Sequence, residues 1–178
     1  MAEPQRLQNF KAQLAEKLER AQGADVSAAK LGFVAGGHYW LVNLDQVNEV
    51  ITVPELTAAP WAQDWFVGVA SVRGLLYGCT DLAAFLKLAE PMPPGESRLL
   101  LVHPRFGINA ALRIERALGL RVVSDLTAVA MPAASPTALP TAVADWEISR
   151  WRDAEGHYWR EISLQKLVAL PEFLEVGV

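Results

Sequence analysis

The sequence predicts a mainly β protein, and two features of its pattern carry that prediction. Short apolar runs recur at spacings of roughly 8–12 residues with turn residues between them, as in sandwiches and barrels. The clearest run is 66–72, FVGVASV, which follows a turn signal at Pro60 and ends at Arg73-Gly74. An apolar, β-branched run between such breakers is typical of a strand. A charged side chain at its end has to lie at the rim, pair with an anion or face a partner, because burying an unpaired guanidinium is too costly.

Composition excludes several classes of protein. The chain has 178 residues, of which 52% are hydrophobic and 20% charged, so we expect a globular body of one domain or two small ones. The net charge is −4 and no run of Lys or Arg forms a basic stripe, so nucleic acid is not an expected partner. Charges or prolines interrupt every apolar segment, and the polar N-terminus lacks the core of a secretory signal. We therefore expect no direct membrane insertion and a cytoplasmic location, which the single cysteine also fits.

Residues 4–22 predict a helix, with apolar side chains at heptad-like spacings and Gly23 as its stop. Two roles remain open for it: a helix that docks on its own domain, or an arm that binds a partner. The face that would bind a partner carries Leu7, Phe10, Leu14 and Leu18. We expect residues 1–29 to form this helix and a linker, and residues 30–178 to form the main domain.

The main domain opens with a predicted hairpin. Residues 31–34 form the first strand and residues 38–44 the return strand. Gly36 and Gly37 between them suit a two-residue turn that needs positive φ angles.

Residues 45–51 alternate between polar and apolar side chains, which predicts a further strand. On a regular strand, Val47 and Ile51 face inward with Glu49 on the same side. Pro54 ends the run.

After the central run, residues 75–77 continue as a strand. Thr80 or Asp81 then caps a short helix by accepting a backbone N–H. The apolar residues of that helix are Leu82, Phe85, Leu86 and Leu88.

The second half begins with a predicted strand over 98–102 and a turn at Pro104-Arg105. Residues 108–120 are ambiguous: their alanines and leucines favour a helix, whereas their alternation favours a strand.

The last part of the chain predicts a second hairpin. Residues 145–151 and 157–162 are its strands, and residues 153–156 are its turn. A short capped helix follows over 163–168 and is stopped by Pro171.

The residue patterns that carry chemistry do not predict a catalytic, metal or cofactor site. Ser71 does not sit in the strand-turn-helix motif of a serine hydrolase, and Cys79 has no nearby histidine, so a buried inert thiol is expected. The glycines match neither the dinucleotide-binding nor the phosphate-binding loop. The histidines, which lack metal-binding spacings, are His38, His103 and His157.

Residues 47–86 resemble the CheW-like coupling domain of bacterial chemotaxis systems. That family typically shows a V-x-E-V segment, a loop with proline, a hydrophobic run with an internal Gly that ends in Arg-Gly, and then a strand leading to Asp-Leu. The resemblance extends more loosely over residues 30–170, and it favours a strand over residues 113–120. The matching central positions are Val47, Glu49, Val50, Pro54, Pro60, Trp65, Gly68, Val69, Arg73, Gly74, Asp81 and Leu82.

The resemblance implies a double five-stranded β-barrel with short helices, to which this chain adds its N-terminal helix. It also implies a non-enzymatic adaptor without a cofactor, which ties the cytoplasmic tip of a chemoreceptor to the regulatory domain of a CheA-like histidine kinase. Such a protein works in the cytoplasm at membrane-bound receptor arrays. The N-terminal helix, the tryptophans and the ending over 159–178 are most similar to coupling proteins of type IV pilus twitching systems.

The resemblance also implies a receptor-binding surface. It consists of Val47, Glu49, Val50, Val72, Arg73 and Gly74. An ion pair between Glu49 and Arg73 that only pins two strands is the competing interpretation, and both roles can hold together. Two other readings of the whole chain remain open: a flagellar coupling protein, and a small β-barrel enzyme or ligand-binding module that uses Trp61 and Trp65.

Overall fold

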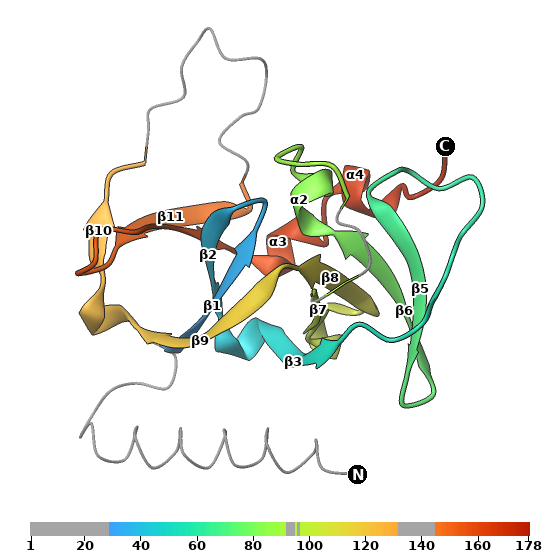
Figure 1. The fold of residues 1–178 in the computed structure, drawn as a ribbon, viewed down its shortest axis with the longest axis horizontal. Coiled ribbons are helices and arrows are strands. Elements are labelled where there is room, and N and C mark those ends of the chain that lie inside the picture. The colour runs from blue at the N-terminus through green and yellow to red at the C-terminus, as the bar shows by residue number, and fades with distance from the viewer. Residues whose placement is uncertain (1–28, 92–94, 96, 132–144) are drawn as a thin grey trace, which may run out of the picture.

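The computed structural model describes residues 29–91, 95, 97–131 and 145–178, and these form two β-sheets with a few short helices (Figure 1). The strands are β1 (Ala29–Ala35), β2 (His38–Asn43), β3 (Val47–Thr52), β4 (Leu56–Thr57), β5 (Phe66–Val72), β6 (Leu75–Asp81), β7 (Arg98–Val102), β8 (Ala110–Ile114), β9 (Arg116–Val122), β10 (Thr127–Val129), β11 (Glu147–Arg152) and β12 (Tyr158–Ile162). The helices are α2 (Leu82–Phe85), α3 (Leu164–Leu167) and α4 (Pro171–Leu174), with 3-10 turns η2 (Leu44–Gln46), η3 (Pro104–Phe106) and η4 (Val123–Asp125). The predicted mainly β fold is confirmed, whereas the helix expected over 4–22 lies outside the described residues.

The two sheets lie side by side and share one chain (Figure 1). The first sheet has the strand order β10-β11-β12-β2-β1-β9, and the second has the order β3-β7-β8-β6-β5-β4. Each contains five longer strands and one short edge strand, β10 or β4, which agrees with the expected pair of five-stranded units. The chain leaves the first sheet after β2, builds the second sheet with β3 to β8, and returns at β9.

The hairpin predicted at the start of the domain is confirmed. Ala35 pairs with His38, so the loop holds two residues. Gly36 and Gly37 have φ angles of 60° and 71°, which only glycine adopts without strain.

The prediction that Val47, Glu49 and Ile51 share one face of β3 is wrong. Val47 pairs with Val102 and Glu49 with Leu101, so β3 advances by two residues where β7 advances by one. This bulge flips the alternation of side chains. Val47 packs into the core between the sheets, whereas Ile51 packs against a cluster within the second sheet.

The strand β7 shows how the core is divided. Its run Leu99–Val102 is buried on both faces, as in a central strand covered on each side. Leu100 and Val102 join the core between the two sheets, and Leu99 and Leu101 join a smaller cluster of the second sheet. The core between the sheets also contains Phe33, Trp40, Leu82, Leu112, Ile114, Ile162, Leu164 and Phe173.

The end of β6 is tied to β8 by a buried ion pair. Asp81 Oδ1 accepts the backbone N–H of Ala84 at 3.0 Å and so caps α2, one of the two predicted alternatives. Its other oxygen, Oδ2, accepts from Nε and a terminal nitrogen of Arg113 at 3.0 and 2.8 Å. Both side chains are buried, and the pair joins two neighbouring strands.

The ambiguous segment 108–120 is a pair of strands, β8 and β9, as the resemblance favours. The predicted C-terminal hairpin and capped helix are also present, and Ser163 Oγ accepts the N–H of Lys166 at the start of α3. Pro171 follows α3 as expected, and it also occupies the first turn of α4, where its missing N–H costs nothing.

Candidate partner-binding surface

The surface expected to bind a receptor is centred on the turn between β5 and β6. Val72 pairs with Leu75, so Arg73 and Gly74 are the two loop residues. Their φ angles are 51° and 81°, as in a type I′ hairpin turn. Glycine adopts this conformation freely, whereas Arg73 is held in it at some cost in backbone strain.

Arg73 forms the expected ion pair with Glu49. A terminal nitrogen of its guanidinium lies 2.8 Å from Glu49 Oε1. The strand β3 is at one edge of the second sheet and β5 lies next to the other edge, so the pair spans the curved sheet. The Arg73 side chain is 72% exposed and that of Glu49 12% exposed. Most of the guanidinium is in contact with water, which screens the pair and limits its contribution to stability to roughly 0–1 kcal/mol.

The valines expected at this surface are less accessible. Val47 belongs to the core between the sheets. Val50 is partly buried against that same core, and Val72 is partly buried against the second sheet's own cluster. Arg73 and the turn are therefore the more exposed part of the expected surface.

Two leucines beside the turn are exposed, and neither was among the predicted site residues. Leu75 and Leu76 are 51% and 65% exposed at the start of β6. Consecutive apolar residues directly after an Arg-Gly turn are the signal that could have found them, because alternation sends at least one outward. Together with Arg73 they form what we call the hairpin tip: Arg73, Gly74, Leu75 and Leu76.

The other residues expected to meet a partner are divided between two regions. The apolar stripe of Leu7, Phe10, Leu14 and Leu18 lies outside the described residues. Trp61 is 83% exposed with a φ of 62°, and its carbonyl accepts the N–H of Val178 at 2.8 Å. Trp65 is half-buried, with its ring 5.0 Å from that of Phe85. Of these two tryptophans only Trp61 therefore presents a surface.

Cys79 is unsuited to act as a nucleophile. Its thiol is buried in the second sheet's cluster. Burial raises the pKa of Cys79 to about 11, and a backbone hydrogen bond with Ala70 and the charge of Arg113 offset only part of that effect. The thiol is therefore protonated at neutral pH, and it is the thiolate that reacts.

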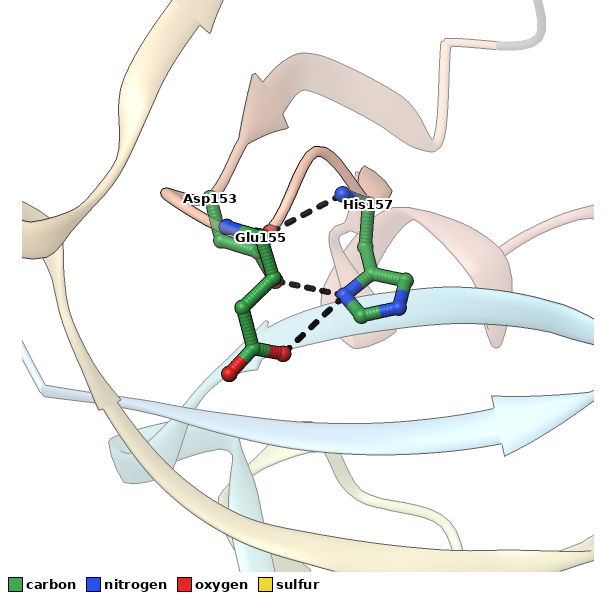
Figure 2. Close-up of side chains that lie close together, drawn as sticks. All are labelled: Asp153, Glu155 and His157. Atoms are coloured by element: carbon green, nitrogen blue, oxygen red, sulfur yellow. Dashed lines mark hydrogen bonds and ion pairs between the residues drawn. The ribbon is translucent and has the colours of Figure 1, made fainter.

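Figure 2 shows one group of potential metal ligands in the described part of the chain, at the turn between β11 and β12. Asp153, Glu155 and His157 each bring one ligand atom within 4.8 Å of the others. Asp153 Oδ1 accepts the backbone N–H groups of Glu155 and His157, and its Oδ2 accepts from the Trp159 indole at 2.9 Å. These bonds anchor the turn and account for the position of the Asp153 carboxylate without a metal.

Burial raises the pKa of the Asp153 carboxyl, but hydrogen bonds from the Trp159 indole and from His157 outweigh it. The net result is a pKa lowered to about 2. Asp153 is therefore a carboxylate across the physiological range of pH.

Within the described residues, no helix is both long and apolar enough to span a bilayer.

The family is decided by comparison with known proteins. The family model of the CheW-like domain matches residues 30–158. The chain belongs to the CheW-like family. CheW-like proteins are scaffold adaptors of chemosensory signalling; as a family they are non-enzymatic and couple receptors to CheA-type kinases.

Two further comparisons agree with this assignment. Protein PilI of Pseudomonas aeruginosa is 33% identical over 108 residues, which cover 61% of this chain and 60% of PilI. The crystal structure of the scaffolding protein TtCheW from Thermoanaerobacter tengcongensis has a TM-score of 0.63 at 15% identity, over 82% of this chain and 95% of that one. At that identity the likeness to TtCheW concerns the fold. The likeness to PilI spans about 60% of that relative's length.

Proposed function

We propose that this CheW-like protein couples a chemoreceptor to a CheA-like histidine kinase in a pathway that controls type IV pilus twitching motility. It does so in the cytoplasm, at membrane-bound receptor arrays, by binding the receptor's cytoplasmic tip and the kinase's regulatory domain. The similarity to PilI supports the pilus pathway over a flagellar one. The observation that carries the receptor-binding part is the hairpin tip, where an exposed arginine sits beside two exposed leucines.

The composition of the hairpin tip suits a helical protein partner. Arg73 is held by one carboxylate and retains further N–H donors for an acidic or polar group of the partner. Leu75 and Leu76 add apolar area that gains stability only when a partner covers it. Arginine is one of the residue types that are enriched in binding hot spots.

The test is a binding assay between the full chain and a receptor cytoplasmic fragment. We expect Arg73→Ala to leave the fold intact, because water screens its largely exposed guanidinium and the pair contributes roughly 0–1 kcal/mol to stability. Receptor affinity should fall by about tenfold or more, as for other arginine hot spots. Arg105→Ala is the control, because Arg105 is likewise an exposed arginine in an ion pair of 2.8 Å, with Asp45. Unchanged receptor binding by folded Arg73→Ala protein contradicts the proposal.

A charge swap separates a structural ion pair from a receptor contact. The double variant Glu49→Arg/Arg73→Glu keeps two opposite charges at the same two positions. If the pair only pins two strands, the swap retains receptor binding. If Arg73 contacts the receptor, the swap loses binding while the melting temperature stays close to that of the original protein.

A further inference from the structure

A basic hollow lies on the first sheet, away from the hairpin tip of the second sheet. It has a volume of about 320 Å³ and is lined by His38, Arg150, Tyr158, Trp159 and Arg160. Its residues come from β2, β11 and β12, which are neighbours in the sheet. Arg150 and Arg160 are directly opposite each other in the β11–β12 ladder, so their side chains leave the sheet on the same face.

A buried carboxylate holds the two guanidinium groups in place. Glu147 Oε1 lies 2.6 Å from Arg150 Nε, and Glu147 Oε2 lies 2.6 Å from a terminal nitrogen of Arg160. Burial raises the pKa of Glu147, but the hydrogen bonds from Arg160 and Arg150 outweigh it and leave that pKa below its ordinary value. The three groups therefore carry two positive charges and one negative charge at neutral pH.

This arrangement leaves hydrogen-bond donors for a further anion. A guanidinium carries five N–H donors, and one nitrogen of each arginine bonds to Glu147. The Nε of Arg160 is buried and out of reach of a ligand in the hollow, so the remaining donors of Arg160 are those of its terminal nitrogens. The plane of that guanidinium is set by Trp40, whose ring centroid lies 4.4 Å from the central guanidinium carbon. Donors that are fixed before binding lose little entropy when a ligand arrives.

The rest of the lining is aromatic. Tyr158 is exposed, and His38 is exposed at the start of β2. The Trp159 ring leaves the sheet on the opposite face, where it packs on Tyr39 and its indole donates to Asp153. Flat side chains next to guanidinium groups suit a ligand that joins an anionic group to a planar or apolar body. The volume lies at the small end of ligand pockets, which run from about 300 to 1,000 Å³.

We propose that this hollow binds a small organic oxyanion, a molecule whose phosphate or carboxylate group meets Arg150 and Arg160 and whose body lies against Tyr158. The site is separate from the proposed receptor contact, since it is on the other sheet and shares no residue with the hairpin tip. A bound oxyanion would add to the ion pairs with Glu147 without replacing that carboxylate.

The test is calorimetric titration of the full chain in low-salt buffer with three probes: phenyl phosphate, phthalate and inorganic phosphate. We expect saturable binding of phenyl phosphate or phthalate. The tighter binder of the two shows whether the hollow prefers a phosphate or a carboxylate. Inorganic phosphate should bind at least several-fold more weakly, because it has no body to contact Tyr158. Nuclear magnetic resonance should show the strongest shifts at the backbone amides of Tyr158 and Trp159.

Arg150→Gln should weaken the better probe by about tenfold or more, the usual consequence of losing a charged hydrogen bond. Arg116→Gln is the control, because it removes the same charge from an exposed position on β9 and should change affinity less than twofold. His38→Gln, at an exposed residue, provides a second variant if Arg150→Gln fails to fold. The proposal is overturned by absence of saturable binding, by equal effects of Arg150→Gln and Arg116→Gln, or by inorganic phosphate binding as tightly as phenyl phosphate and phthalate.

Discussion

Replacing Asp81 by alanine should destabilise the protein far more than an average substitution. The carboxylate caps α2 through Ala84 and receives two hydrogen bonds from Arg113. Its side chain has no exposed surface, and that of Arg113 is only 7% exposed. Removing one partner of a buried ion pair costs about 3–5 kcal/mol because the other charge stays behind, uncompensated. Loss of the cap adds about 1 kcal/mol.

The expected total of about 4–6 kcal/mol is a large part of the 5–15 kcal/mol that usually stabilises a domain. For a chain of this size it corresponds to a fall in melting temperature of about 10–20 °C. Urea unfolding measures the free energy of unfolding of each variant. If the slope of this free energy against urea concentration is the same as in the original protein, the unfolded state is unaltered. Asp45→Ala is the matched control, since Asp45 bonds to Arg105 at the same 2.8 Å on the surface and should cost less than 1 kcal/mol.

A second pair of variants separates burial of charge from loss of packing. Asp81→Leu/Arg113→Met replaces both charges with apolar side chains, and such replacements of buried pairs are often neutral or better. The double variant should therefore be more stable than Asp81→Ala, although it also lacks the cap. The reasoning is refuted if Asp81→Ala costs no more than Asp45→Ala, or if the double variant is the less stable of the two.

Two further predictions concern a glycine and a pH dependence. Gly68→Ala should lower the free energy of unfolding, measured by thermal unfolding, by at least about 2 kcal/mol. The reason is that Gly68 has a φ of 126° and an added Cβ would lie 2.5 Å from the Thr57 carbonyl oxygen. Gly107→Ala has open space for its Cβ and should lower the free energy of unfolding by only about 1 kcal/mol, through backbone strain. Asp153 has a pKa of about 2 in the folded protein, compared with an ordinary value of 3.8 in an unfolded chain. Its carboxylate therefore stabilises the fold fully above pH 3.8, and this contribution is lost as the pH falls from 3.8 through 2. Asp153→Asn should thus be less stable than the original protein by about 1 kcal/mol at pH 6, and urea titrations should show this gap narrowing between pH 4 and pH 2. A gap that is constant over that range would contradict the assignment.

Local chemistry made much of the fold predictable. Gly36-Gly37 and Arg73-Gly74 are turns because both positions of a two-residue hairpin loop need positive φ. Asp81 is a cap because a short acceptor side chain just before a helix can reach an unpaired N–H. These features depend on residues a few positions apart, so their outcome can be worked out before the tertiary structure is known.

The features that were missed depend on which strands pair and in what register. The bulge between Val47 and Glu49 becomes visible only once β3 is aligned on β7. The buried pair of Lys30 and Glu161 joins residues 131 positions apart. A charged residue inside an apolar strand signals that a partner exists, since an unpaired buried charge is too costly, but it does not say which residue the partner is.

The residues of the two candidate surfaces were also predicted only in part. The turn at Arg73 and its pairing with Glu49 were expected, whereas the exposure of Leu75 and Leu76 was not. Whether a strand residue at a hairpin end is covered depends on how far the neighbouring strands extend, which is a property of the assembled sheet. Arg150 became part of a candidate site only through its position opposite Arg160 across β11 and β12.

The two surfaces proposed here differ in how firmly their arginines are held, and this difference matches the partners assigned to them. Arg73 is held by a single ion pair on a two-residue turn and its guanidinium is largely exposed, so its side chain can adjust to a protein surface at little cost. Arg150 and Arg160 are held by the two oxygens of Glu147, whose side chain is 5% exposed, and Arg160 also stacks on Trp40. A small ligand offers few contacts, so it binds measurably only where the donors are positioned in advance. A protein partner buries enough area to offset the ordering of a mobile side chain, which is why the less rigid of the two sites is the one suited to a receptor.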